Sequence, residues 1–331
     1  MVPKRDAAHI PLGTANIPDG SRQRSNAGVL IALLIFLAIG GVSCNIESPG
    51  TGGSPPTIGI RFDFRVTDVE PAWSPDGRTV AYVHGDTGNG QTGIWLMDTN
   101  GTDNRILFAG TDAYDPTWSP DGHWIAFSNN RDIFKINLNG DSLTQLTYGA
   151  NDFEPAWSPD GKRIVYDRSV ATTLGPSGVW LITYSGVDAE SIAQYGMYPT
   201  WYPGGRKILF VMASSDSKGQ PLGDSLLSYN IQSSSFDAVK FLSGATFETR
   251  YPKISPDDSK VAFTSASYAG SPQIWVMNSN GTDLQQLTTQ QGYTCSWSPD
   301  GKWLVYTDSD TTSGRLWMMR RDGSQNHPLS Y

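Results

Sequence analysis

The sequence predicts an all-β fold, a six-bladed β-propeller with four-stranded antiparallel blades. A Trp-Ser-Pro-Asp-Gly motif recurs along most of the chain at intervals of about 45 residues. Short apolar segments separated by turn residues fill each interval. The composition agrees, because 35 Gly, 21 Pro and 11% aromatic residues, with only 17% charged residues, favour short strands and turns over helices.

The repeated motif predicts the turn between the first two strands of each unit. Four copies are intact and two are altered; in chain order they are Trp73–Gly77, Trp118–Gly122, Trp157–Gly161, Trp201–Gly205, Ile254–Asp258 and Trp297–Gly301. Proline presets φ in such a turn, and Asp-Gly closes it. We therefore expect the aspartate of the motif to have a structural role.

The remainder of each unit predicts three more strands. A second strand such as Val80–Tyr82 follows the turn, and a third such as Ile94–Met97 comes after a variable loop. An Asn-Gly turn, as at Asn100–Gly101, then leads into a short outer strand such as Leu143–Thr147. Four strands in about 45 residues are typical of a propeller blade. We expect six blades to fill residues 58–331, with the tryptophans in the core between blades.

Two segments compete to complete the last blade and close the ring. Residues 58–66 alternate apolar and polar side chains, as a half-buried strand does. His327–Ser330 offers the same closure from the C-terminal side. The clearer alternation favours residues 58–66.

These motifs resemble the TolB-type β-propeller repeat, in which a Trp-Ser-Pro-Asp-Gly turn precedes an Ile-Ala-Phe-like strand, as at Ile125–Phe127. The resemblance covers about residues 58–331 and implies the same propeller fold. TolB carries an α/β domain before its propeller, whereas residues 45–57 stand in that place here. The difference argues against a direct role in the Tol system.

The first 44 residues have the features of an export signal. Basic residues precede an apolar run, Val29–Ile39, which is short for a membrane span and is followed by small residues. Cys44 follows Val-Ser and resembles the lipobox of bacterial lipoproteins. This implies a signal peptide over 1–43 and lipidated Cys44 as the mature N-terminus; an uncleaved signal anchor is the alternative. Residues 45–57, rich in Gly, Pro, Ser and Thr, predict a flexible tether.

Either form of the leader predicts an extracytoplasmic, membrane-anchored propeller, in the periplasm or at the surface of a bacterium. The net charge of −8 argues against nucleic acid as a partner. No Gly-x-Ser-x-Gly elbow occurs, and the three histidines outside the leader, His84, His123 and His327, fall in different registers of the repeat, which argues against a catalytic triad or a metal site. We expect neither enzymatic activity nor a cofactor, and we expect a monomer.

One set of side chains suggests a binding site. The first strand of each propeller blade lines the central channel, so side chains near its start form a ring at one mouth. Just before the repeated proline, or before Cys295 in the last unit, stand Glu70, Asp115, Glu154, Tyr198, Tyr251 and Thr294. Nearby positions add Asp68, Tyr114, Asp152, Phe153, Arg250 and Tyr293. Blades 1–3 would present carboxylates, and blades 4–6 tyrosines and an arginine.

Two interpretations of this ring stay open. The side chains could cap turns or hydrogen-bond neighbouring blades, which is a purely structural role. Alternatively, the acidic half could attract a basic or amphipathic peptide or a cation, while the aromatic half supplies apolar contact. We expect a non-catalytic propeller that binds an envelope protein or peptide at this mouth. A sensor that binds a small ligand or a glycan there is the alternative.

Overall fold

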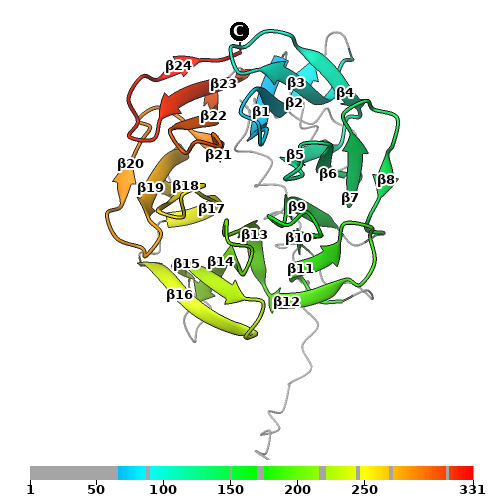
Figure 1. The fold of residues 1–331 in the computed structure, drawn as a ribbon. Coiled ribbons are helices and arrows are strands. Elements are labelled where there is room, and N and C mark those ends of the chain that lie inside the picture. Colours follow the sequence, from blue (N-terminus) through cyan, green and yellow to red (C-terminus); the bar gives the residue numbers. More distant parts are fainter. Residues whose placement is uncertain are drawn as a thin grey trace, which may run out of the picture. The chain divides into compact units, whose positions relative to one another are not determined.

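The computed structural model describes residues 66–86, 90–149, 151–169, 175–215, 221–243, 247–267, 271–310 and 313–330. Within these ranges the chain forms six four-stranded antiparallel sheets and no helix. The sheets are arranged as blades around a common axis (Figure 1). This confirms the predicted six-bladed β-propeller. The predicted signal peptide, Cys44, the tether and residues 58–65 lie outside the described residues. The described part contains no helix capable of crossing a membrane.

Each blade consists of four strands that are consecutive in the chain. Grouped from blade 1 to blade 6, they are β1 (Val66–Trp73), β2 (Thr79–Asp86), β3 (Gly93–Asp98) and β4 (Arg105–Ala109); β5 (Ala113–Trp118), β6 (Trp124–Asn129), β7 (Asp132–Asn137) and β8 (Thr144–Gln145); β9 (Asp152–Trp157), β10 (Arg163–Arg168), β11 (Gly178–Thr183) and β12 (Glu190–Gln194); β13 (Gly196–Trp201), β14 (Lys207–Ser215), β15 (Pro221–Asn230) and β16 (Ser235–Ser243); β17 (Phe247–Ile254), β18 (Lys260–Ser267), β19 (Gln273–Asn278) and β20 (Gln285–Gln286); β21 (Tyr293–Trp297), β22 (Trp303–Asp310), β23 (Ser313–Arg320) and β24 (His327–Pro328). The first strand of each blade lies nearest the axis (Figure 1).

The repeated turn is held by its own serine and aspartate. In blade 2, Ser119 Oγ donates to Asp121 Oδ1 at 2.6 Å, and the same oxygen accepts the N–H of His123 at 3.0 Å. Ser119 Oγ also accepts the N–H of Trp124 at 2.9 Å. These bonds lower the pKa of Asp121, with the serine bond as the main cause. The same contacts recur at Ser74, Ser158, Ser255 and Ser298. The structural role expected for the aspartate is therefore confirmed.

The apolar core lies between the blades. Each of six buried clusters joins side chains from two neighbouring blades around the ring. The tryptophan at the end of the first strand often reaches across the junction to a backbone carbonyl of the preceding blade. Trp118 donates its indole N–H to Ala72 at 3.0 Å, and Trp201 donates to Ala156 at 3.1 Å. Trp297 makes the same bond to Lys253.

The ring closes differently from the closure that the alternation favoured. The outer strand of blade 6 is β24, where His327 pairs with Met318 and Pro328 with Trp317. Val66 instead begins β1, the inner strand of blade 1. The prediction that residues 58–66 complete the last blade was therefore wrong. Only two residues of β24 pair regularly, which is too short a segment to show an alternation. No sheet is shared between blades 1 and 6 among the described residues.

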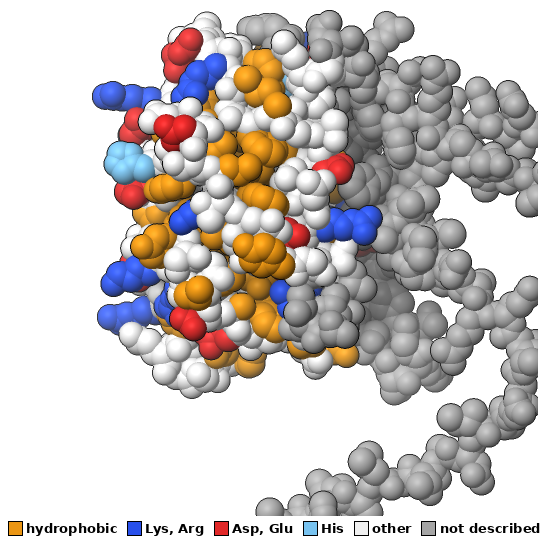
Figure 2. Space-filling model, turned by 90° about the vertical axis from the view of Figure 1, so that its right-hand side faces the viewer, with side chains coloured by type: hydrophobic (Ala, Val, Ile, Leu, Met, Phe, Trp, Pro, Cys, Tyr) orange, Lys and Arg blue, Asp and Glu red, His pale blue; other side chains and the backbone are white. Residues whose placement is uncertain are grey.

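Apolar side chains remain exposed on the outer rim of the propeller. Ile106 on β4 and Phe236 on β16 are both more than two-fifths exposed. Figure 2 shows apolar side chains along the middle of the rim, while charged side chains gather toward one edge. In this view the middle of the rim is therefore more apolar than its charged edge.

Candidate binding site around the propeller axis

The inner strand of every blade carries a β-bulge at the predicted site position. In blade 1 the pairing of β1 with β2 passes from Val69 opposite Val83 to Ala72 opposite Ala81, so two residues face one. The other five inner strands have the same irregularity. In blades 1–5 the first bulged residue is left-handed, with φ between 53° and 56°; these residues are Glu70, Asp115, Glu154, Tyr198 and Tyr251. A bulge re-aims a side chain, and a left-handed residue other than glycine stores strain.

Carboxyl groups of blades 1–3 link successive blades through these bulges. Glu70 Oε2 accepts the N–H of Asp115 at 2.7 Å. Asp115 Oδ2 accepts the N–H of Glu154 at 3.2 Å and the hydroxyl of Ser128 at 2.6 Å. Asp167 Oδ2 then accepts the N–H of Tyr198 at 3.1 Å. We call Glu70, Asp115, Glu154 and Asp167 the acidic arc. Its members hold neighbouring blades together, as the structural interpretation required.

The acidic arc is electrostatically strained. Burial raises the pKa of Glu70 to about 8, and the charge of Asp115 adds to the shift. Burial likewise raises the pKa of Asp167 to about 7 and that of Glu154 well above its usual value. The pKa of Asp115 is raised too, again mainly by burial. Burial therefore disfavours the charged forms of all four carboxyl groups, and a cation placed among them would be strongly favoured.

Lys253 is the cation that this chain itself supplies to the arc. It lies on β17 and is half-buried, and its charge lowers the pKa of Glu70, Asp115 and Glu154 from across the ring. The corresponding inner-strand position holds only small residues in the other blades: Ala72, Thr117, Ala156, Thr200 and Ser296. Neither Lys253 nor Asp167 was predicted from the sequence. A lysine at a small-residue position was the available signal for Lys253, and an acid within a buried second strand was the signal for Asp167.

The aromatic side chains of blades 4–6 pack against one another. The ring centroids of Tyr198 and Tyr251 are 4.7 Å apart, and those of Tyr251 and Tyr293 are 5.4 Å apart. Arg250 Nη1 donates to the hydroxyl of Tyr293 at 3.2 Å and also pairs with Glu248. We call Tyr198, Tyr251, Tyr293 and Arg250 the aromatic arc. Tyr251 and Tyr293 are buried, whereas Tyr198 and Arg250 are half-buried.

In blade 6 the bulge position is occupied by Thr294, which has no carboxyl group. Thr294 does not adopt the left-handed conformation of its five counterparts. Its hydroxyl lies 3.2 Å from that of Thr307, which accepts the N–H of Glu70 at 3.1 Å. Thr307 thus links blade 6 to blade 1, as the carboxyl groups of the acidic arc link blades 1–4.

Two predicted site residues are each held by a basic residue of their own blade. Asp68 Oδ1 lies 2.7 Å from His84 Nδ1. Asp152 accepts two hydrogen bonds from Arg168, whose guanidinium lies 4.2 Å from the ring centroid of Trp180. Asp68 and Asp152 are both buried. They therefore support the inner strands, and the charge of Asp152 also raises the pKa of Asp167 in the acidic arc.

The remaining predicted residues, Tyr114 and Phe153, are half-buried beside the bulges of blades 2 and 3. Burial and the charge of Glu70 raise the pKa of Tyr114 to about 12, which indicates that its ring lies near the acidic arc. Among the described residues, no group of three or more His, Cys, Asp or Glu side chains has the arrangement of a metal site. The axis thus combines an acidic half with an aromatic half, the polarity that the sequence predicted.

Comparison with known proteins agrees with this architecture. The family described as the TolB β-propeller domain matches residues 64–195 and 193–331. A putative TolB from Agrobacterium tumefaciens is 20% identical, with a TM-score of 0.60 over 70% of this chain and 86% of that one. TolB from Acinetobacter baumannii has the same identity and TM-score, over 91% of this chain and 69% of that one. The β-propeller domain of the Trilobed protease from Pyrococcus furiosus is 13% identical, with a TM-score of 0.53 over 80% and 84%.

Proposed function

Because this chain belongs to the TolB β-propeller domain family, we propose that it is a non-catalytic propeller that binds an envelope protein or peptide at its channel mouth. TolB-like propellers generally bind other proteins, and TolB-type relatives are periplasmic. The leader supports export, with the chain held at the membrane through lipidated Cys44 or through an uncleaved anchor. In this proposal the propeller acts as a monomer on the extracytoplasmic side.

The observation that carries the proposal is the division of the axis into an acidic and an aromatic arc. A basic side chain entering the channel would neutralise carboxyl groups that otherwise repel one another or retain protons. The half-buried Tyr198 and Arg250 would meet the apolar and acidic parts of the same segment. Asp68 and Asp152 would act through the inner strands that they stabilise.

The experiment compares three forms of the full chain as bait in cross-linking capture from bacterial envelopes. One is the unmodified chain, and one carries Glu70→Gln, Asp115→Asn and Glu154→Gln. Amide oxygens can still accept the backbone N–H groups, so the blades should remain linked. A matched control neutralises three exposed acids, Asp103, Asp188 and Glu190.

We expect a protein captured by the unmodified chain and the control to be lost from the arc variant, and its capture to weaken as salt rises. Equal capture by the arc variant, with circular dichroism showing all three forms folded, would refute binding through the acidic arc. Loss of a partner on changing only Tyr198 and Tyr251 to Leu would instead indicate recognition by the aromatic arc, as a glycan would require.

A further inference from the structure

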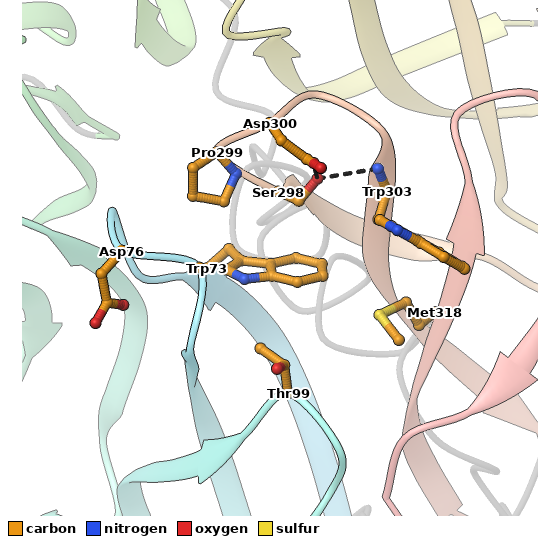
Figure 3. A pocket seen from close by; sticks show the side chains of 9 residues that line it. Trp73, Asp76, Thr99, Ser298, Pro299, Asp300, Trp303 and Met318 are labelled. Atoms are coloured by element: carbon orange, nitrogen blue, oxygen red, sulfur yellow. Dashed lines mark hydrogen bonds between the residues drawn. The ribbon is translucent and has the colours of Figure 1, made fainter.

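A cavity of about 480 Å³ lies between blades 6 and 1, away from the arcs (Figure 3). Trp73 comes from the end of β1, whereas Trp303 and Met318 come from β22 and β23. Figure 3 shows the two indoles and the thioether around one space, with Thr99 on the blade 1 side. Its volume is within the range that small-molecule sites occupy.

The junction of blades 2 and 3 is built from the same parts. Trp124 corresponds to Trp303, since the backbone N–H of each donates to the serine hydroxyl of its own turn at 2.9 Å. Trp157 corresponds to Trp73 as the first tryptophan of the following blade. The turns are also equally close: a Cβ on Gly77 would lie 3.7 Å from Pro299, and the equivalent distance from Gly161 to Pro120 is 3.7 Å.

The indole N–H groups set these two junctions apart from the others. Those of Trp73 and Trp157 are buried and have no hydrogen-bond partner among the described residues. Trp118, Trp201 and Trp297 instead donate to a carbonyl of the preceding blade. The 2/3 and 6/1 junctions therefore share one packing mode, so the contents of one indicate what the other accommodates.

At the 2/3 junction an ammonium group of the chain itself fills the space. Lys135 Nζ lies 4.9 Å from the ring centroid of Trp124 and 4.7 Å from that of Tyr184. It donates to the carbonyl of Tyr184 at 2.8 Å and forms no ion pair with a described carboxylate. Lys135 is only 7% exposed. Aromatic faces therefore hold this buried cation, as in cation–π recognition.

At the 6/1 junction the two filling residues are absent. Met318 takes the place of Lys135. Each lies on the third strand of its blade and pairs with the third residue of the second strand, β22 for Met318 and β6 for Lys135. Thr99 takes the place of Tyr184. In each case the backbone N–H donates to the carbonyl of the residue that lies two positions after the aspartate of the repeated turn in the same blade. The 480 Å³ cavity occupies the space that the lysine and tyrosine side chains fill in the other junction.

We propose that the blade 6/1 cavity binds a small-molecule alkylammonium compound, with its cationic group against Trp73 and Trp303. Asp76 and Asp300 at the edges of the cavity add negative charge. Two cations of the chain lie nearby. Lys302 pairs with Asp300 at 3.3 Å but is largely exposed, and Arg320 lies 4.4 Å from the ring centroid of Trp303 without lining the cavity. The site is independent of the arcs, so it neither requires nor tests the proposed function.

The test is a titration of the full chain with n-butylammonium chloride, followed by the indole N–H resonances in NMR spectra, with 1-butanol as the uncharged control. We expect saturable shifts at Trp73 and Trp303 with the ammonium compound only. The double variant Thr99→Tyr, Met318→Lys recreates the 2/3 junction and should weaken binding about tenfold or more. The reciprocal variant Lys135→Met, Tyr184→Thr should open a second site of similar affinity.

Equal binding of 1-butanol, or no saturable shift, would overturn the proposal. So would undiminished binding by the folded Thr99→Tyr, Met318→Lys variant. If that variant does not fold, Met318→Lys alone serves, because it places the cation in the cavity without adding a ring. Thermal unfolding of each variant separates loss of the site from loss of the fold.

Discussion

The ion pair between Arg168 and Asp152 should contribute strongly to the stability of blade 3. Both side chains are nearly inaccessible, at 5% and 0%, and two hydrogen bonds of 2.8 and 3.2 Å join them. Replacing Arg168 with Met removes the cation but leaves the aspartate buried. Breaking a buried pair in this way costs about 3–5 kcal/mol, a large part of the roughly 5–15 kcal/mol that stabilises a typical domain.

The assay is urea unfolding followed by tryptophan fluorescence, applied to Arg168→Met, Asp152→Asn and the double variant. The double variant should be more stable than Arg168→Met alone, since no uncompensated charge then remains. The more accessible pair, Asp68 with His84, provides a matched comparison and should show a smaller effect for His84→Met. A loss below about 1 kcal/mol for Arg168→Met, or no recovery in the double variant, would refute the reasoning.

Three further predictions concern the acidic arc, the repeated turn and the buried thiol. The pKa of Glu70 is raised from 4.5 to about 8 and that of Asp167 from 3.8 to about 7, so the folded chain retains protons that the unfolded chain releases. The free energy of unfolding, measured from urea midpoints, should therefore fall as pH rises from about 5 to 8. The double variant Glu70→Gln, Asp167→Asn should flatten this pH dependence, and an unchanged slope in that variant would contradict the reasoning. Asp121→Ala removes two turn hydrogen bonds and should cost about 1–2 kcal/mol in the same assay, whereas an unaltered midpoint would show that the turn needs no side-chain support. Burial raises the pKa of Cys295 to about 12, so mass spectrometry should find it unmodified by a thiol reagent until urea unfolds the chain; rapid labelling of the native protein would disprove this.

The repeat made most of the fold predictable. Each Trp-Ser-Pro-Asp-Gly motif fixes one turn, and the spacing between motifs leaves room for one blade. Ring closure was not predictable in this way, because β24 has only two ladder pairs and the segment is otherwise held by hydrogen bonds between Leu316 and the buried Leu329 and Ser330. Alternation in residues 58–66 was the stronger local pattern, but β24 supplies the outer strand of blade 6.

The candidate site was predictable as far as its positions share one register. Glu70, Asp115 and Glu154 were brought together from the place that each occupies before its proline. Asp167 and Lys253 were not predicted, because they reach the axis from positions that hold other residue types in most blades. The partners of Asp68 and Asp152 were not predicted either, although each partner lies sixteen residues after its aspartate in the sequence.

The bulge on the inner strands of blades 1–5 gives the channel lining a backbone position that accepts several residue types. Glutamate, aspartate and tyrosine all occupy the same left-handed backbone position with nearly identical φ angles. The backbone there is set by the ladder on either side and not by the side chain. Redesign of the channel lining should therefore be easiest at Tyr198 and Tyr251, which have this backbone conformation but supply no carboxyl bond to a neighbouring blade.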